Sequence, residues 1–293
     1  MRCSIHGYDM KRGETIWVGI IGIFKRSVGL AVGSVIVAVF ILVALLAPLV
    51  APGDPNSMNV LKRLSSPSAS FWLGSDHLGR DLFTRILYGA RISLVVGAAS
   101  TLGSALGGIV LGLMGGFHRR IGGIIMRVID GMMALPGMLL ALALMAVLGP
   151  SVANIVVALI VIYTPRMARV QHAAVLQIKN RDYITAAHAT GASQSYIMFR
   201  HVLPNSYAPV VVQSTFTFAY AIVAEASLSF LGVGSSPDTP SWGNILANGR
   251  DYLLAAPWIC LIPGLAIFAV VIGLNLAGDG IRDVFDPHRS GIA

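Results

Sequence analysis

The stretch RDYITAAHATGASQSYIMFRHVLPN, residues 181–205, forms the second part of a charged segment that begins at Arg166. Apolar runs long enough to cross a membrane lie on both sides of this charged segment. An ordinary solvated loop is one interpretation of its composition. The spacing of its residues favours another, a folded element at the membrane surface that a soluble partner could grip.

Two short helices are predicted within this stretch. Asp182 or a neighbour can start the first helix, which continues through alanines of high helix propensity. Gly191 permits the left-handed turn that ends it. Ser193 can cap a second helix, which Pro204 stops at the next span. A compact helix-turn-helix joined to a span on each side can carry a push from a soluble motor into the membrane.

The composition is that of a membrane protein. Of the 293 residues, 55% are hydrophobic and only 12% are charged. A water-soluble chain of this length would lack the polar groups to cover its surface. The net charge of +8 comes without a dense basic run interleaved with aromatic residues, so we expect no nucleic-acid partner. We predict an all-α polytopic protein of the cell inner or plasma membrane.

Six apolar stretches are long enough to span a bilayer. A spanning helix needs about 20 mostly apolar residues, because the hydrocarbon core is about 30 Å thick and each residue rises about 1.5 Å. The fourth stretch is the weakest, since Pro165 and Arg166 lie near its end. The predicted spans are Val28–Val50, Ile92–Phe117, Val128–Leu148, Val152–Val170, Tyr207–Leu231 and Pro257–Ala277.

The basic residues predict the orientation. With a cytoplasmic N-terminus, fifteen of the 21 Lys and Arg residues fall on the cytoplasmic side and six on the other. The positive-inside rule then places both termini and the segment Arg166–Asn205 in the cytoplasm. The expected divisions are a tail at 1–27, the first span at 28–50, an outer loop at 51–91, a membrane core at 92–278 that includes the element at 166–205, and a tail at 279–293.

The segment Ile16–Phe24 is apolar but too short to cross a bilayer, and basic pairs flank it. A helix that lies in the inner membrane interface fits this pattern. A cleavable signal peptide is the alternative interpretation of the first apolar run. The apolar core of that run is too long for a signal peptide, and 27 residues precede it.

The second span carries glycines at helical spacing along one side. Small residues at that spacing let two helix backbones approach closely within lipid. No GxxxxGK[ST] motif occurs in the chain, so these glycines are not part of a phosphate-binding loop and the chain should not itself hydrolyse a nucleotide. The glycines expected at a helix contact are Gly103, Gly107, Gly108 and Gly112.

No catalytic or metal-binding constellation is apparent in the sequence. The seven histidines are scattered, without HExxH or paired Cys/His spacing, and no G-x-S-x-G elbow occurs. We therefore expect no catalytic residue, no metal and no cofactor in this chain. Cys3 and Cys260 fall in different environments, which argues against a disulfide.

Polar residues inside spans are candidates for a transport pathway, because burying them in lipid is costly. Glu225 is the sharpest candidate and follows Gln213 and Thr217 in the fifth span. Its carboxylate either faces a wet cavity or packs against a neighbouring helix or partner subunit, and both interpretations stay open. We also expect an ion pair between Asp130 and Arg127, and helix-to-helix hydrogen bonds from Asn154 and Asn275.

The cytoplasmic stretch resembles the permease subunits of ATP-binding-cassette importers. Their signature is Glu-Ala-Ala, three residues, Gly, nine residues, Ile, one residue, Leu-Pro. Thr185 stands here in place of the glutamate and His201 in place of the isoleucine. Within the family the chain is most similar to the C-type permease of dipeptide and oligopeptide importers, through LGSDHLGRDLFTRILYGARISL from Leu73, ASLSFLGVG from Ala226, PSWGNILANGRDYL from Pro240 and GDGIRDVFDPHR from Gly278.

The resemblance implies a type I importer permease that pairs with a second, homologous permease. Two ATPase subunits, which bind the ATP and Mg, would dock on the cytoplasmic helices, and an external binding protein would deliver peptide. Gln213, Thr217 and Glu225 would then belong to spans that form the pathway wall. The residues implied in coupling to the ATPases are Asp182, Thr185, Ala186, Ala187, Gly191, Ala192, Leu203 and Pro204.

Two other classes were weighed against the importer permease. A secondary transporter should show ion-coupling carboxylates, broken paired helices and more spans in one chain. An intramembrane enzyme should place several reactive groups at one depth. The substrate stays open within the importer class, since relatives carry peptides, nickel chelates, glutathione or other small solutes.

Overall fold

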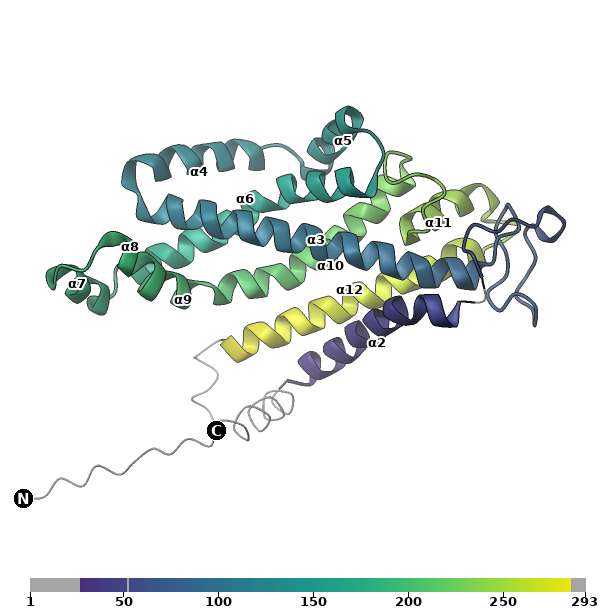
Figure 1. Ribbon diagram of the computed structural model, residues 1–293, viewed down its shortest axis with the longest axis horizontal. Coiled ribbons are helices and arrows are strands. Elements are labelled where there is room, and N and C mark those ends of the chain that lie inside the picture. Colours follow the sequence, from purple (N-terminus) through teal and green to yellow (C-terminus); the bar gives the residue numbers. More distant parts are fainter. Residues whose placement is uncertain (1–26, 52, 286–293) are drawn as a thin grey trace, which may run out of the picture.

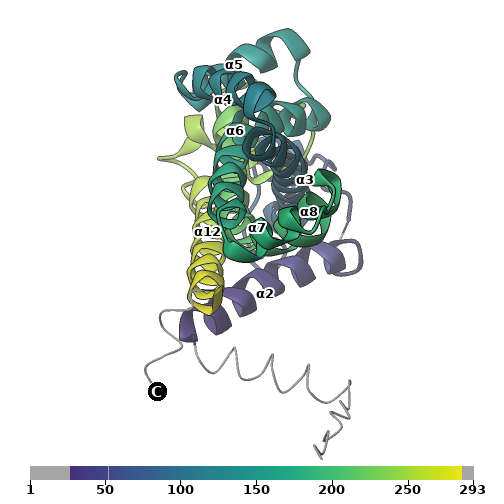
Figure 2. The same cartoon turned by 90° about the vertical axis from the view of Figure 1, so that its left-hand side faces the viewer.

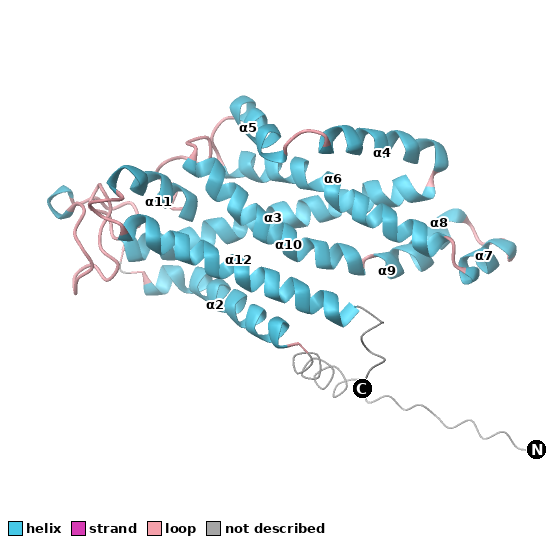
Figure 3. Ribbon diagram, turned by 180° about the vertical axis from the view of Figure 1, so that it is seen from behind, coloured by secondary structure: helices cyan, strands magenta, loops and turns pink. Residues whose placement is uncertain are grey.

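The computed structural model describes residues 27–51 and 53–285, which fold mostly into helices (Figure 3). Within these residues no β-strand forms, and Ser75 and Asp81 make only an isolated bridge. The predicted interfacial helix at Ile16–Phe24 lies outside the described residues. The architecture confirms the predicted all-α fold class.

Five helices are long and apolar enough to cross a membrane. Each overlaps a predicted span, but three of them continue well beyond it, because a helix can extend past the hydrocarbon into a polar region. The helix of the second predicted span starts at Leu82 rather than Ile92. That of the fourth ends at Lys179 rather than Val170, and that of the sixth ends at Phe285 rather than Ala277. The five are α2 (Val28–Val50), α3 (Leu82–Phe117), α6 (Val152–Lys179), α10 (Ala208–Phe230) and α12 (Trp258–Phe285).

The predicted third span, Val128–Leu148, is wrong as one continuous helix. The structure has two helices there, α4 (Arg119–Met133) and α5 (Gly137–Leu148), bent by 90° at the break between them. Pro136 explains the break, because proline lacks the N–H that would continue the helix and disfavours helical geometry at Leu135. Counted as one broken span, the pair brings the described chain to six.

Helix α3 lies in the middle of the bundle, where it contacts α2, α4, α6, α10 and α11 (Figure 1). Helix α12 packs against α2 and α10. Seen end-on, α2 and the α4–α5 pair occupy opposite edges of the bundle (Figure 2). The long helices therefore form one connected frame between two ends that carry the short elements.

At one end lie α7 (Asp182–Ala189), α8 (Gln194–Ile197), the π-helical turn η2 (Met198–Val202) and α9 (Leu203–Ser206) (Figure 1). At the other end lie residues 53–81 with η1 (Val60–Lys62), together with α11 (Trp242–Gly249) and η3 (Arg250–Tyr252). We call these the α7–α9 end and the α11 end. The fully buried Trp242 anchors α11 in an apolar cluster with residues of α2, α3, α10 and α12.

Candidate coupling and transport sites

Residues 182–206 form a helix-turn-helix between the ends of α6 and α10 (Figure 1; Figure 2). The first helix starts at Asp182, whose carboxylate in the first turn complements the positive end of the helix dipole. Ser193 caps the second helix, because its hydroxyl accepts a hydrogen bond from the Tyr196 N–H at 3.2 Å. Both helix starts lie where the sequence predicts them.

The turn between the two helices depends on Gly191. Its φ of +83° lies in the left-handed region, as predicted. The Gly191 N–H donates to the His188 carbonyl at 3.0 Å, and the Ala192 N–H donates to the Ala187 carbonyl at 3.1 Å. These two bonds form a Schellman motif, which satisfies the last carbonyls of α7. A Cβ at Gly191 would meet nothing within 4 Å, so the backbone conformation alone selects glycine.

An apolar cluster fixes the helix-turn-helix to two long helices. Ile184 from the first half and Ile197 and Val202 from the second half are fully buried. Because α3 and α6 supply the rest of the cluster, α7 packs against the ends of both helices. The remaining buried members are Leu113 and Phe117 of α3 and Val175 and Ile178 of α6.

The outward face of α7 carries small side chains. Thr185 and Ala186 are exposed, while Ala187 is half-buried against the apolar cluster. Thr185, which stands where the resembling family has a glutamate, thus points away from the core. At Thr185 and Ala186 this face is therefore small and uncharged.

Sequence reasoning missed an aromatic group beside this face. The His201 ring lies edge-on to two tyrosine rings, with centroids 5.5 Å from Tyr196 and 6.3 Å from Tyr183. Tyr183, Tyr196 and Phe199 stay 42%, 54% and 60% exposed. His201 therefore replaces the family's isoleucine with a ring that packs among aromatic side chains. In the sequence, the i, i+3 spacing of Tyr196 and Phe199 could have indicated this aromatic group.

Pro204 does not stop the second helix, contrary to the prediction. Helix α8 runs through the π-helical turn into α9, and Pro204 lies in the first turn of α9. The π-helical turn just before Pro204 is closed by the bond from the Leu203 N–H to the Met198 carbonyl, and this wider turn accommodates a residue without an N–H inside a continuing helix. The chain leaves the helix at Tyr207 instead, and Leu203 packs against the apolar cluster.

Two polar contacts join α6 to its neighbours near the helix-turn-helix, one to α9 and one to α3, and neither was predicted. Gln171, which is fully buried, donates from Nε2 to the Ser206 hydroxyl at 2.7 Å. The Lys179 ammonium donates to the carbonyls of Gly116 and Phe117, at 3.3 Å each, at the end of α3. A cation there complements the negative end of the α3 dipole.

The glycines singled out in the second span face α6. A Cβ at Gly107 would lie 3.2 Å from the Thr164 methyl carbon, and one at Gly112 would lie 2.5 Å from the Gln171 Cβ. The two backbones therefore approach more closely than larger residues allow. The glycines in contact with α6 are Gly103, Gly107, Gly108 and Gly112.

Glu225 is buried where three helices meet. Its side chain belongs to α10 and the residue is 1% exposed. The Ser93 hydroxyl of α3 donates to Oε2 at 3.0 Å, and the Ser229 hydroxyl donates to Oε1 at 2.9 Å. The backbone N–H of Trp242 in α11 donates in turn to the Ser93 hydroxyl at 3.3 Å. Of the two interpretations, these contacts favour a packing role in this conformation.

The other two pathway candidates lie elsewhere on α10. Gln213 donates from Nε2 to the Thr217 hydroxyl at 3.4 Å, one turn away. Thr217 is 1% exposed and Gln213 is half-buried. Glu225 lies about two turns farther along the helix, so the structure does not bring the three residues into one site.

Of the predicted polar contacts, one takes another partner and one forms between two helices as expected. Asp130 pairs with Arg169 of α6 rather than with Arg127, because α4 lies against α6 and offers a partner across the helix contact. Asn154 donates to the carbonyls of Leu148 at 2.7 Å and Gly149 at 3.0 Å. This contact joins α6 to α5, as predicted, and caps the carbonyl end of α5.

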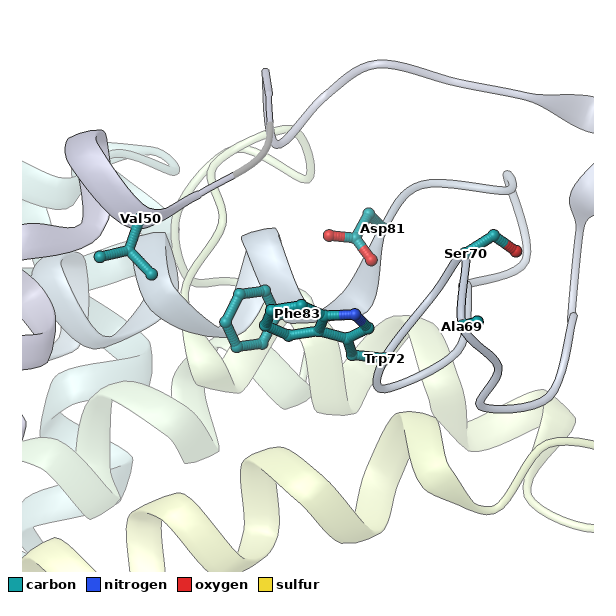
Figure 4. A pocket seen from close by; sticks show the side chains of 6 residues that line it. All are labelled: Val50, Ala69, Ser70, Trp72, Asp81 and Phe83. Carbon is teal, nitrogen blue, oxygen red and sulfur yellow. The ribbon is translucent and has the colours of Figure 1, made fainter.

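A cavity of about 260 Å³ lies at the α11 end (Figure 4). Trp72 and Phe83 form its aromatic wall, with ring centroids 5.0 Å apart. The Asp81 carboxylate caps α3 and accepts from the Thr84 N–H at 2.9 Å and the Thr84 hydroxyl at 2.6 Å. The acidic group that lines this cavity is therefore engaged in holding the helix.

Membrane-length helices, one broken span and a helix-turn-helix seated on two spans define a polytopic all-α membrane protein. A solved structure of the MetNI methionine ABC transporter, in inward-facing conformations, shares the fold with a TM-score of 0.54 at 19% identity. The match covers 70% of this chain and 97% of that chain. The predicted importer-permease fold is confirmed.

The sequence comparisons supply the family. Residues 108–291 match the family described as binding-protein-dependent transport system inner membrane component, and the chain belongs to that family. Residues 15–67 match the N-terminal transmembrane domain of oligopeptide transport permease C.

Two curated relatives cover most of the chain. The dipeptide transport system permease protein of Alkalihalophilus pseudofirmus is 43% identical over 280 residues, which is 95% of this chain and 92% of the relative. The di/tripeptide transport system permease protein of Pseudomonas aeruginosa is 45% identical over 251 residues, 83% of each chain. The predicted resemblance is thereby confirmed over nearly the whole length.

Proposed function

We propose that this chain forms half of the translocation pathway of an ATP-driven importer for di- or oligopeptides. A second, homologous permease supplies the other half as a heterodimer. Two ATPase subunits bind ATP and Mg, and an external binding protein delivers the peptide. The peptide assignment rests on the names of the two relatives, and the importer class rests on the family.

The orientation follows from the charge distribution. Both termini and the α7–α9 end lie in the cytoplasm in this proposal, because the basic residues concentrate on that side. The α11 end then faces outward, where the binding protein docks. The α7–α9 end is therefore the part of the chain that an ATPase can reach.

The observation that carries the proposal is the way the helix-turn-helix is built. Its core side chains join the apolar cluster of α3 and α6, while its outer face exposes Thr185, Ala186 and the aromatic edges. An ATPase that grips the outer face displaces α7 as a rigid body, and the buried cluster passes this displacement to α3 and α6. The break between α4 and α5 is a place where the bundle can yield.

Reconstitution of the complete importer in lipid vesicles tests the proposal. Peptide-loaded binding protein should stimulate ATP hydrolysis and drive peptide uptake, and vesicles without the ATPases should take up none. Uptake without the ATPases would instead indicate a secondary transporter. Glutathione and nickel chelates, offered in the same assay, should be imported more slowly than dipeptides if ordinary peptides are the substrate.

A further inference from the structure

Arg166 lies well inside the membrane-spanning part of α6. It stands 14 residues after Val152, about 21 Å along the helix, whereas the hydrocarbon core is about 30 Å thick. Tyr220, whose ring lies beside the Arg166 guanidinium, stands 12 residues after the start of α10, about 18 Å along that helix from the other side of the membrane. Two helices that run in opposite directions thus agree that the guanidinium sits at membrane depth, although the charge count assigned it to the cytoplasm.

The Arg166 side chain is exposed in the isolated chain and makes no ion pair within residues 27–51 and 53–285. Its guanidinium lies 5.5 Å from the centre of the Tyr220 ring. The Tyr163 hydroxyl donates to the Tyr220 carbonyl at 3.1 Å and so ties α6 to α10 at the same level. An unpaired charge at this depth is costly against lipid and therefore faces water or an anionic group.

A groove opens beside this guanidinium at the break between α4 and α5. It encloses about 200 Å³, and Met132, Met133, Tyr163 and Arg166 are among the residues that line it. The nearby acidic side chain, Asp130, is engaged by Arg169. The groove therefore combines an apolar wall with one guanidinium that is free to bind an external anion.

We propose that Arg166 binds the C-terminal carboxylate of the peptide as it crosses the membrane. This inference rests on the peptide transport proposed above. A guanidinium is the side chain best suited to a carboxylate, because it can donate two parallel hydrogen bonds to the two oxygens. The carboxylate is the anionic group that every unmodified peptide carries at its end, so the contact is independent of peptide sequence.

Uptake of alanyl-alanine and of its C-terminal amide by the complete importer tests the proposal. Each peptide is supplied at a concentration that saturates the binding protein, so that the preference of the binding protein does not enter. The wild-type importer should carry the acid about tenfold faster than the amide, the scale of a hydrogen bond to a charged group. Arg166→Gln should slow the acid to the rate of the amide and leave the rate of the amide unchanged, and Arg166→Lys should retain part of the preference for the acid.

Arg127→Gln is the matched control, since it removes an exposed arginine from the neighbouring helix α4 and should keep the wild-type preference. Co-purification with the partner permease verifies assembly of each variant. Equal loss of both peptides in Arg166→Gln would overturn the proposal and point to a carboxylate of the partner subunit. A wild-type importer that carries acid and amide equally would also overturn it. Failure of the wild-type importer to carry any peptide would overturn the proposed function itself.

Discussion

The two ends of the helix bundle are held by different kinds of interaction. At the α7–α9 end, apolar burial and backbone caps hold a surface that is otherwise exposed. At the α11 end, buried charges and side-chain hydrogen bonds hold the loop of residues 53–81 and the segment around α11. We therefore expect the first end to tolerate a change of side chain wherever shape is kept, and the second end to depend on individual polar partners.

Asp76 is the centre of the polar network at the α11 end. Its carboxylate accepts from the Leu78 and Arg80 N–H groups, at 2.9 Å each, and from the Arg80 guanidinium at 2.6 Å. Arg85 lies 3.8 Å away and donates to the Pro55 carbonyl at 3.1 Å. One aspartate therefore organises two buried arginines and the loop that covers them.

The neighbouring segments are fastened in a similar way. Asn244 of α11 donates to the Ser235 hydroxyl and to the Ser236 and Thr239 carbonyls at 2.9–3.0 Å. His77 stacks on Tyr252 with ring centroids 5.5 Å apart, and burial lowers the pKa of His77. A lowered pKa favours the neutral form of His77, which suits a site that already holds two buried arginines. Residues 53–81 and the segment around α11 are thus fixed to each other by contacts within the chain.

Of the proposed substitutions, Asp76→Asn should have the largest effect on stability, and it tests the polar α11 end. The variant leaves Arg80 and Arg85 buried without a counter-charge, which costs about 3–5 kcal/mol. The purified protein should lose thermal stability, and protease should reach residues 53–81. The control is Asp251→Asn, which breaks an exposed ion pair with Arg250 and should change the free energy of unfolding by less than about 1 kcal/mol. Equal stability of the two variants would contradict the role given to Asp76.

Ile184→Ala should have the next largest effect, and it tests the apolar end. Ile184 is fully buried, so its truncation leaves a cavity between α7 and the α3–α6 pair that costs about 2–4 kcal/mol. The helix-turn-helix should become accessible to protease while residues 53–81 stay protected. Ile124→Ala on α4, where the isoleucine is 64% exposed, is the matched control and should leave the cleavage pattern unchanged. Exposure of both ends in Ile184→Ala would show that they do not unfold independently.

The same contrast explains what could be predicted from the sequence. Apolar length predicted the long helices, and glycine and serine chemistry predicted the turn at Gly191 and the cap at Ser193, because these depend on local preferences. The break at Pro136 was visible as a proline but not used. The helix extensions to Leu82 and Lys179 were missed because hydropathy does not register a helix that continues beyond the lipid.

Long-range polar contacts could not be predicted in the same way. The contact of Glu225 with Ser93 joins residues 132 positions apart, and that of Lys179 with the end of α3 joins residues 62 and 63 positions apart. Their partners are set by how α3, α6 and α10 pack, which no single segment encodes. The pairing of Asp130 with Arg169 instead of Arg127 is the same failure on a smaller scale.

Gly191→Val should have the smallest effect on stability and a clear effect on coupling. A β-branched residue resists the left-handed conformation by about 1–2 kcal/mol, although nothing within 4 Å opposes its Cβ. The variant should therefore relax the turn and misplace α7 relative to the α3–α6 cluster, so that ATP hydrolysis by the complete importer drives less peptide uptake per ATP. Gly191→Asn is the control, because asparagine adopts the left-handed region more readily and should keep most of the coupling. Normal uptake per ATP in Gly191→Val would mean that the shape of this turn is not what the ATPase acts upon.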